Sequence, residues 1–306
     1  MSLSASDHEL QAMVGAVRGN DRVVRRDILW EWALSRVERV HLDGGGTLIV
    51  KRSREPLIDE GRILRQLAGG GIPLPELFDA NVRDGVLTLA LEDLGPSTRE
   101  ATLQEAALAA VRTHAARPPD GLDMLDAAAL AALPSRALTA LDRLERAGRW
   151  PESENGRSAL TRLQAMAGAL SGGADVPPFG LCHSEFHPTS VHVGSKKTGV
   201  LDWARAFVGP GLLDLASYAG TVAPPDPAAC RALIEAYAAE GGAPPARDAR
   251  AGLPAERWAL FWHRVWVVEW YARSCATWMD DPSQDGVFQE TVQRHAEEAL
   301  SMANGA

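Results

Sequence analysis

The sequence predicts an α+β fold with two lobes, a small β-rich N-terminal lobe and a larger, mostly helical C-terminal lobe. Over residues 22–92, short apolar and β-branched segments alternate with glycine-containing turns, which is typical of a sheet. Residues 93–96 break this pattern, and beyond them apolar residues recur at helical spacing. We therefore expect the N-terminal lobe at 1–92, a hinge at 93–96 and the C-terminal lobe at 97–306.

A β-hairpin is the clearest element of the N-terminal lobe. Residues 36–42 end in strand-like alternation, residues 43–46 are a strong turn signal, and residues 47–50 resume apolar and β-branched character. The hairpin delivers Lys51 on its second strand. The other elements expected in this lobe are a short helix within 1–20, a helix over 56–67 and strands at 77–78 and 86–91.

Helical spacing continues through the C-terminal lobe. We expect helices at residues 102–115, 124–132, 134–147, 158–170, 212–222, 226–240, 255–278 and 286–302.

Composition narrows the class of protein. The chain has 306 residues, a net charge of −9 and three cysteines without metal-site spacing, which we interpret as reduced thiols. The negative charge argues against a nucleic-acid partner and is compatible with a cationic substrate. Long apolar runs and a signal peptide are both missing from the sequence, so we expect no membrane segment and a cytoplasmic location. Its oligomeric state, monomer or homodimer, stays open.

Lysine is scarce in this chain. Only three of its 31 basic residues are lysines, as expected from a GC-rich genome that favours arginine. Lysine is a compact point charge, whereas arginine is a planar fork. A phosphate contact would explain the lysine at position 51, and chance survival on a solvated strand face is the alternative.

The most informative stretch is residues 181–216. It contains His183-Ser184-Glu185, then Ser190, then Asp202 at the end of an apolar run, and finally Asp214. Phosphoryl transfer needs one carboxylate facing the acceptor hydroxyl and another that holds a metal ion against nucleotide phosphates. The order of residues in this stretch suits that chemistry.

This stretch resembles the aminoglycoside phosphotransferase and choline kinase-like family, whose catalytic segment usually reads H-G-D-x-H-x-x-N and is followed by a strand ending in I-D-W. Glu185 stands where Asp is usual, and Ser190 stands where Asn is usual. The resemblance implies a protein-kinase-like fold and a small-molecule kinase that uses ATP or GTP with Mg²⁺.

The resemblance also implies roles for individual residues of the stretch. Glu185 would be the general base for the acceptor hydroxyl, although its side chain is one methylene longer than Asp. Asp202 would bind the metal, with the shorter Ser190 as second ligand. His183 and Asp214 would brace the catalytic loop. The neighbouring His187 and His192 do not have the spacing of a zinc site, so we interpret them as hydrogen-bonding residues.

In the N-terminal lobe, the resemblance implies that Lys51 contacts the nucleotide phosphates and that Glu60 holds it as an ion pair. Glu55 and Asp59 are rival partners for Lys51. The segment 91–94 resembles the family's hinge, so Glu92 and Leu94 would border the base. No glycine-rich phosphate loop precedes the first expected strand, and Ser35 is the candidate phosphate contact there.

The acceptor site has no motif of its own. Trp258, Trp262, Trp266 and Trp270 form one helical stripe, which serves either core packing or, for one or two of them, stacking on a sugar or base. Glu269, Asp280 and Asp281 lie nearby and could bind amines of a cationic acceptor. The acceptor residues that we select are Trp266, Glu269 and Trp270.

We expect transfer of the γ-phosphoryl group to a hydroxyl of an antibiotic-like acceptor, either an aminoglycoside or a nucleoside antibiotic, in a resistance enzyme. A metabolic kinase for an amino alcohol or sugar is one alternative. A degenerate pseudokinase that binds nucleotide or a partner is another, and the residues at positions 185 and 190 keep it open.

Overall fold

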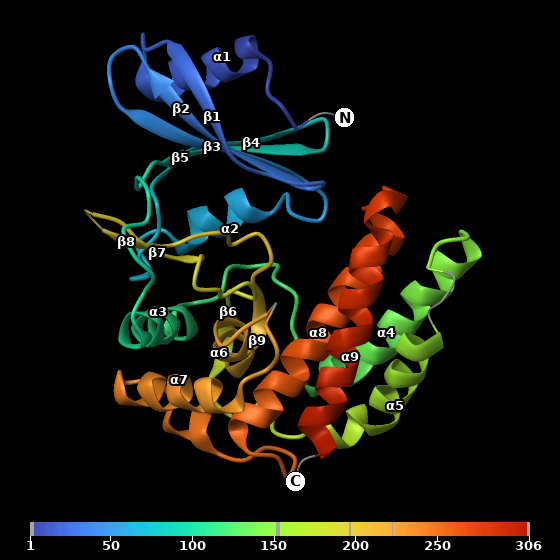
Figure 1. Ribbon diagram of the computed structural model, residues 1–306. Coiled ribbons are helices and arrows are strands. Elements are labelled where there is room, and N and C mark those ends of the chain that lie inside the picture. Colours follow the sequence, from blue (N-terminus) through green and yellow to red (C-terminus); the bar gives the residue numbers. More distant parts are fainter. Residues whose placement is uncertain (1–2, 151–153, 196, 222, 305–306) are drawn as a thin grey trace. The chain divides into compact units, whose positions relative to one another are not determined.

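The computed structural model describes residues 3–150, 154–195, 197–221 and 223–304. The chain forms two compact units, of which the first comprises residues 1–100 and 190–205 and the second comprises residues 101–189 and 206–306. The first unit is rich in strands and the second is mostly helical, so the predicted α+β class is confirmed (Figure 1).

The division differs from the expected boundaries in two segments, of which the shorter, residues 97–100, was expected in the C-terminal lobe but belongs to the first unit. We expected residues 190–205 in the C-terminal lobe, but they belong to the first unit. This segment contains a hairpin of β7 (Val191–Val193) and β8 (Thr198–Val200). The N–H of Val200 donates to the Pro73 carbonyl at 2.7 Å, and the N–H of Thr98 donates to the Val193 carbonyl at 2.8 Å. These backbone bonds, which no local pattern reveals, join the hairpin to the first unit.

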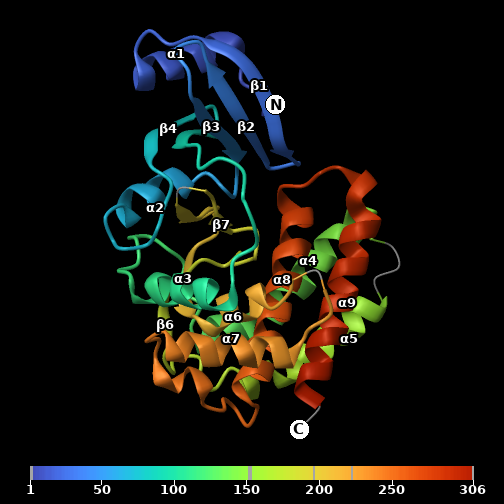
Figure 2. The same cartoon turned by 60° about the vertical axis from the view of Figure 1, so that its left-hand side comes forward.

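The first unit is built on a five-stranded antiparallel sheet in the order β1-β2-β3-β5-β4, with α1 on one face and α2 on the other (Figures 1 and 2). The bounds are α1 Asp7–Arg18, β1 Val23–Glu31, β2 Ser35–Leu42, β3 Thr47–Arg54, α2 Glu60–Leu67, β4 Leu77–Arg83 and β5 Val86–Glu92. Alternate residues of the strands face α1 and form a buried core with it, including Val40, Leu48 and Val50.

The elements of this unit differ from the predicted ones in the start of α2 and in the presence of β1. The predicted hairpin is present as β2 and β3, whose register pairs Val37 with Lys51. The helix expected over 56–67 begins only at Glu60, because the N–H of Leu57 bonds to the Arg54 carbonyl in a turn. Strand β1 was not predicted, since it is an exposed edge strand without clean alternation of apolar and polar residues.

Helix α2 packs closely on the sheet because residue 61 is glycine. A Cβ atom at this position would lie 2.8 Å from Cβ of Ala80 and 3.0 Å from a methyl group of Leu89. The side of the sheet that carries Lys51 is therefore covered by α2 over β4 and β5, whereas Val37 and Ile49 on β2 and β3 stay half-buried.

The second unit is a set of packed helices in which α4, α5, α8 and α9 lie side by side (Figure 1). A short antiparallel pair of strands, β6 and β9, lies among the other helices. The bounds are α3 Leu103–Ala115, α4 Ala127–Arg146, α5 Glu154–Leu170, β6 Phe179–Cys182, β9 Phe207–Pro210, α6 Leu212–Tyr218, α7 Pro227–Ala239, α8 Ala255–Thr277 and α9 Asp285–Asn304.

One expectation in this unit was wrong. The two helices expected at 124–132 and 134–147 are a single helix, α4, with Pro134 inside it. Proline removes a helical hydrogen bond and usually breaks a helix. Here Pro134 is buried and α4 packs against α5 and α8, so tertiary packing maintains the helix through that position.

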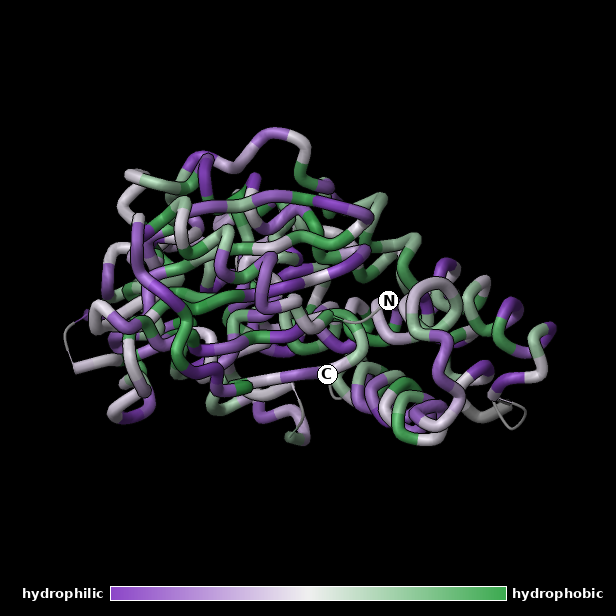
Figure 3. Tube along the Cα trace, turned by 90° about the horizontal axis from the view of Figure 1, so that it is seen from above, coloured by the Kyte–Doolittle hydropathy of each residue, from purple (hydrophilic) through white to green (hydrophobic). Residues whose placement is uncertain are grey.

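Hydrophilic and hydrophobic residues alternate at short intervals along many of the helices (Figure 3). This distribution is typical of helices that bury one face and expose the other. Among the described residues, no helix combines the length and apolar character needed to cross a membrane.

Candidate active site

Three charged residues that are far apart in the sequence meet in the first unit. The ammonium of Lys51 lies 2.7 Å from Oε2 of Glu60 and 2.5 Å from Oδ1 of Asp202. Lys51 and Glu60 are buried, whereas the side chain of Asp202 is 51% exposed. The structure thus selects Glu60 as the partner of Lys51. Its rival Asp59 instead bonds to Arg62 at 3.2 Å.

The environment of Lys51 keeps it charged. Burial favours the neutral amine, but the negative charges of Asp202 and Glu60 outweigh that effect and raise the pKa of Lys51 above its ordinary value. A buried ammonium held beside an exposed carboxylate can bind phosphate oxygens without first acquiring a proton. The chemistry of this cluster therefore suits a polyphosphate ligand with a cation.

Ser190 directly precedes β7, and Asp202 follows shortly after β8, so both residues lie at the open end of the β7–β8 hairpin. The N–H of Leu201 donates to the Ser190 carbonyl at 2.9 Å, so the backbones at residues 190 and 201 are adjacent. Asp202 has φ of 70°, a left-handed conformation that aspartate tolerates better than most residues.

The two side chains offer a carboxylate and a hydroxyl, which are the hard oxygen donors that Mg²⁺ prefers, with phosphates and water completing its coordination. Among the described residues, no three His, Cys, Asp or Glu side chains are grouped so that they could hold a metal ion. The donor atoms of Asp202 and Ser190 fit a magnesium site that phosphates and water complete.

The predicted catalytic loop lies in the second unit, where a buried carboxylate fixes its backbone. Oδ2 of Asp214 accepts from the N–H of His183 at 2.7 Å, and Oδ1 accepts from the N–H of Ser184 at 2.8 Å. Asp214 is fully buried at the start of α6. The expected association of His183 with Asp214 is therefore present, but it runs through the main chain of His183.

The sequence argument missed His114, on α3, which adds a further contact to Asp214. Its Nε2 lies 3.3 Å from Oδ2 of Asp214, and its side chain is 2% exposed. Gly211 makes room for it, because a Cβ at residue 211 would lie 2.6 Å from the imidazole. No local motif around His114 signals this role, since the contact spans 100 residues of sequence.

The loop has an unusual conformation at Ser184. Its φ is 76°, in the left-handed region that favours glycine, and this is the position at which the motif quoted above has glycine. Glu185 follows and is half-buried. The N–H of His187 donates to the Glu185 carbonyl at 2.9 Å, and Nδ1 of His187 lies 3.2 Å from the Ser217 hydroxyl. His187 is thus a hydrogen-bonding residue, as expected.

The expected hinge residues lie at the end of β5. Oε2 of Glu92 lies 2.5 Å from Lys197, and the N–H of Glu92 donates to the Glu76 carbonyl at 2.8 Å. Leu94 is half-buried and packs against the β7–β8 hairpin, where a Cβ at Gly199 would lie 2.6 Å from its methyl group. The backbone N–H of Glu92 is therefore already bonded within the first unit.

Asp93 was not selected from the sequence, yet it anchors this segment. Its carboxylate accepts from Nε of Arg39 at 2.6 Å and from the Gly95 N–H at 2.9 Å. Burial raises the pKa of Asp93, but hydrogen bonds from Arg39, Thr47 and Gly95 outweigh it and lower the pKa below its ordinary value. Two adjacent carboxylates at residues 92 and 93 could have suggested a basic partner, but the local sequence does not indicate that this partner is Arg39 on β2.

Ser35 lies on the same face of the sheet as Lys51. It pairs with Ser53 in the β2–β3 register, two positions beyond the pair of Val37 with Lys51. Ser35 is 4% exposed, and its hydroxyl accepts from the Ser53 hydroxyl at 3.3 Å. The hydroxyl of Ser35 is thus already hydrogen-bonded within the sheet, and its phosphate contact stays a prediction.

The three acceptor candidates on α8 have different environments. Glu269 is 3% exposed and accepts from Arg273 at 2.7 Å. Trp270 is buried, with its ring 6.1 Å from that of Trp278. Trp266 is half-buried, and its ring lies 6.0 Å from that of Phe207. Most of the tryptophan stripe is therefore core, and Trp266 is the most exposed of the three candidates.

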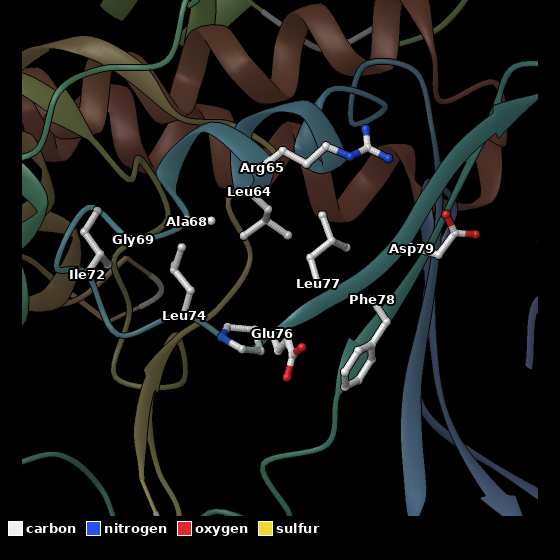
Figure 4. A pocket seen from close by; sticks show the side chains of 11 residues that line it. Leu64, Arg65, Ala68, Gly69, Ile72, Leu74, Glu76, Leu77, Phe78 and Asp79 are labelled. Atoms are coloured by element: carbon white, nitrogen blue, oxygen red, sulfur yellow. The ribbon is translucent and has the colours of Figure 1, made fainter. Parts of the chain in front are cut away.

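A pocket of about 580 Å³ lies between α2 and β4, where Leu64, Leu74 and Leu77 point toward one another (Figure 4). None of the site residues predicted from the sequence lines this pocket. It is therefore separate from the Lys51 cluster.

A β-rich unit with a buried Lys–Glu pair beside the exposed carboxylate of Asp202, together with a helical unit whose loop is fixed by a buried carboxylate, is the combination expected of a small-molecule kinase. The model of the phosphotransferase enzyme family APH matches residues 29–253, and the chain belongs to this family. It is a phosphotransferase with a hydroxyl acceptor, and enzymes of this kind take their phosphoryl group from ATP with a divalent metal. No sequence of a curated protein matches the chain.

Solved structures share the fold at low sequence identity. A choline/ethanolamine kinase family protein from Mesorhizobium loti is 15% identical, with a TM-score of 0.67 over 97% of this chain and 94% of that one. A macrolide 2′-phosphotransferase from Brachybacterium faecium is 19% identical, with a TM-score of 0.60 over 94% and 97%. An aminoglycoside-3′-phosphotransferase of type VIII is 21% identical, with a TM-score of 0.52 over 85% and 97%. These similarities confirm the protein-kinase-like fold.

Proposed function

We propose that this protein transfers the γ-phosphoryl group of a nucleoside triphosphate, with Mg²⁺, to a hydroxyl of an antibiotic-like small molecule. The observation that carries the proposal is the meeting of Lys51, Glu60 and Asp202 within hydrogen-bonding distance. Buried, paired lysines of this kind hold nucleotide phosphates in kinases.

The donor would be held by the first unit. Lys51, fixed by Glu60, would contact the phosphates, and backbone groups of the hinge beyond Glu92 would read the base. Backbone groups discriminate weakly between adenine and guanine, so the proposal includes both ATP and GTP. When bound by Asp202 and Ser190, Mg²⁺ would neutralise the charge that develops on the phosphates.

Glu185 would act on the acceptor. As the acceptor oxygen attacks the γ-phosphorus, Glu185 takes up the hydroxyl proton, a new O–P bond forms, and the bond to the β-phosphate oxygen breaks to release the nucleoside diphosphate. Asp214 supports this step by fixing the loop through the N–H groups of His183 and Ser184. Because the side chain of Glu185 is one methylene longer than that of an aspartate, the loop must hold the backbone of Glu185 further from the acceptor than it would hold the backbone of an aspartate.

The class of acceptor rests on two supports. Two of the similar structures are kinases of macrolides and aminoglycosides, and the net charge of −9 suits a cationic acceptor. A resistance enzyme acting in the cytoplasm, where ATP is available, is consistent with both. A metabolic kinase for an amino alcohol or sugar is the second candidate, favoured by the similarity to a choline/ethanolamine kinase family protein.

The decisive experiment is a product screen. The protein is incubated with Mg²⁺, ATP or GTP, and separate pools of aminoglycosides, macrolides, nucleoside antibiotics, amino alcohols and sugars, and products are detected by mass spectrometry. We expect a mass increase of one phosphoryl group in an antibiotic pool. Phosphorylation confined to amino alcohols or simple sugars would establish the metabolic alternative.

Variants of the loop test the chemistry. Glu185→Ala should abolish the product, and Glu240→Ala, an exposed glutamate at the end of α7, should not change it. Glu185→Asp separates an active site built around glutamate, in which activity falls, from a degenerate one, in which activity appears. Nucleotide binding by calorimetry without any product in the screen would identify a pseudokinase.

A further inference from the structure

The edge strand β1 carries an exposed tryptophan at the phosphate end of the donor-binding sheet. Trp30 is 63% exposed, although tryptophan is usually mostly buried. It is the second-last residue of β1, and β1 is the outermost strand beside β2 (Figure 2).

Sheet register places Trp30 on the same face as Lys51. Trp30 pairs with Val37, and Val37 pairs with Lys51. Residues paired directly across antiparallel strands project to the same face. Two strand spacings separate Trp30 from Lys51, or about 10 Å between their backbones. The half-buried Val37 lies between them in this row.

A β-bulge creates this orientation. The register shifts between Ile28, which pairs with Glu38, and Trp30, which pairs with Val37, so Leu29 is the extra residue. Without the bulge, Leu29 would oppose Val37 and Trp30 would project to the α1 face. Bulges next to active sites commonly re-aim a side chain in this way.

The tip of the hairpin is well anchored, so the position of Trp30 is defined. The N–H of Trp32 donates to the Ser35 carbonyl at 2.9 Å, and the N–H of Arg54 donates to the Leu34 carbonyl at 3.1 Å. Leu34 is fully buried, and Glu31 bonds to Arg36 at 2.6 Å across the two strands. A side chain on such a rigid element can position a ligand.

The direction of the sheet shows which part of the ligand Trp30 would meet. The hinge follows Glu92, which pairs with Leu48 on β3, and Lys51 lies further along β3. The base end of the donor site is therefore near residue 48, and the phosphate end is at Lys51 and beyond. An indole has no donor or charge suited to phosphate oxygens except its single N–H, whereas its broad apolar face suits a ring with C–H groups.

We propose that Trp30 is a specificity-determining residue that stacks on the sugar ring carrying the acceptor hydroxyl. This inference rests on the proposed function, because it places the acceptor beside the terminal phosphate. Stacking on Trp30 would orient the ring, and the phosphoryl transfer itself would still depend on Glu185.

Steady-state kinetics with the acceptor found in the product screen tests the proposal. Trp30→Ala should raise the KM for the acceptor about tenfold, and Trp30→Phe should keep most of the affinity. Neither variant should change the KM for ATP or the melting temperature. Ile28→Ala is the matched control, since Ile28 is 56% exposed on the same strand but pairs with Glu38 on the α1 face.

A second measurement does not need turnover. In protein labelled with 5-fluorotryptophan, the ¹⁹F resonance of Trp30 is identified by its loss in Trp30→Phe among the nine tryptophans. We expect it to stay unchanged with Mg²⁺ and a non-hydrolysable ATP analogue and to shift when a sugar-bearing acceptor is added. A shift without any phosphorylated product would support the proposal while contradicting the proposed function.

Three results would overturn the proposal. The first is an acceptor KM that is the same in Trp30→Ala as in the unmodified protein. The second is a Trp30 resonance that responds to nucleotide alone, which would assign the residue to the donor site. The third is a dimer that dissociates in both Ile28→Ala and Trp30→Ala without any change in acceptor KM, which would make the exposed residues of β1 an interface between copies.

Discussion

The backbone N–H of Trp203 donates a 3.1 Å hydrogen bond to Oε1 of Glu60, whose Oε2 lies 2.7 Å from the ammonium of Lys51. One buried carboxylate on α2 thus holds both the Lys51 ammonium and the segment that carries Asp202. A displacement of α2 would disturb both groups together.

Glu60→Gln separates the charge of this residue from its shape. The amide can still accept from Trp203, but Lys51 loses one of its two counter-charges, so we expect the KM for ATP to rise about tenfold and the free energy of unfolding to fall by about 3 kcal/mol, because a buried ion pair is broken. Glu60→Ala breaks the ion pair and also removes the acceptor for the Trp203 N–H, so it should destabilise the protein further, by about 1 kcal/mol. Steady-state kinetics and urea unfolding measure the two effects. Asp59→Asn, on an exposed neighbour, should change neither.

Asp214→Asn should slow catalysis more than it weakens binding. An asparagine has one carbonyl oxygen, so it can accept from His183 or Ser184 but its NH₂ group opposes the other N–H. We expect kcat to fall about 100-fold through misplacement of Glu185, with the KM for ATP unchanged. His114→Phe, which keeps the packing beside Gly211, should give a smaller loss. An Asp214→Asn enzyme with normal kcat would show that the loop does not depend on this carboxylate.

Ser184→Gly should stabilise the protein. Ser184 has φ of 76°, and its buried hydroxyl has no hydrogen-bond partner among the described residues. Glycine relieves both costs, and we expect a gain of about 1 kcal/mol in the free energy of unfolding. Ser184→Ala removes only the hydroxyl, so its stability should fall between the two. Thermal unfolding by calorimetry gives the order, and a glycine variant that melts below the alanine variant would contradict the strain argument.

The pair of Arg39 and Asp93 predicts a pH dependence. The folded-state pKa of Asp93 lies below its ordinary value of 3.8, so the unfolded chain takes up the proton first as the pH falls. The stability that this carboxylate contributes is present above about pH 4 and is lost as the pH falls through its folded-state pKa. Asp93→Asn should therefore be less stable by about 2 kcal/mol at pH 7.

Urea unfolding of both proteins from pH 7 to pH 3 checks this difference. It should stay constant down to about pH 5 and shrink below about pH 4, since the other carboxylates titrate alike in the two proteins. A difference that persists unchanged at pH 3 would contradict the argument.

The features of this protein that short-range sequence patterns encode could be predicted from the sequence. The glycine turn after Leu42 indicated the hairpin that carries Lys51, and the apolar run before Asp202 indicated a strand end at that carboxylate. The structure brings Glu60 and Asp202 to the ammonium of Lys51, and the predicted metal-binding role of Asp202 stays a prediction. The roles of Glu185 and Ser190 stay predictions, because they concern ligands. Strand β1 and its bulge escaped prediction because an edge strand needs little alternation, and its register is set by β2.

Contacts between segments that are far apart in the chain could not be predicted from the sequence either. His114 reaches Asp214 from another helix, and Arg39 reaches Asp93 from another strand. The continuity of α4 through Pro134 likewise comes from helix packing rather than from residue preference. In each of these places, tertiary structure decides what the local chemistry leaves open.

The hydrogen bonds that Asp214 accepts from main-chain N–H groups have a consequence for which substitutions the loop can tolerate. Every residue except proline offers the same N–H, so a carboxylate 30 residues downstream of Ser184 fixes the loop whatever side chains it carries. Exchange of either His183 or Ser184 for any residue other than proline therefore leaves both N–H groups available to Asp214.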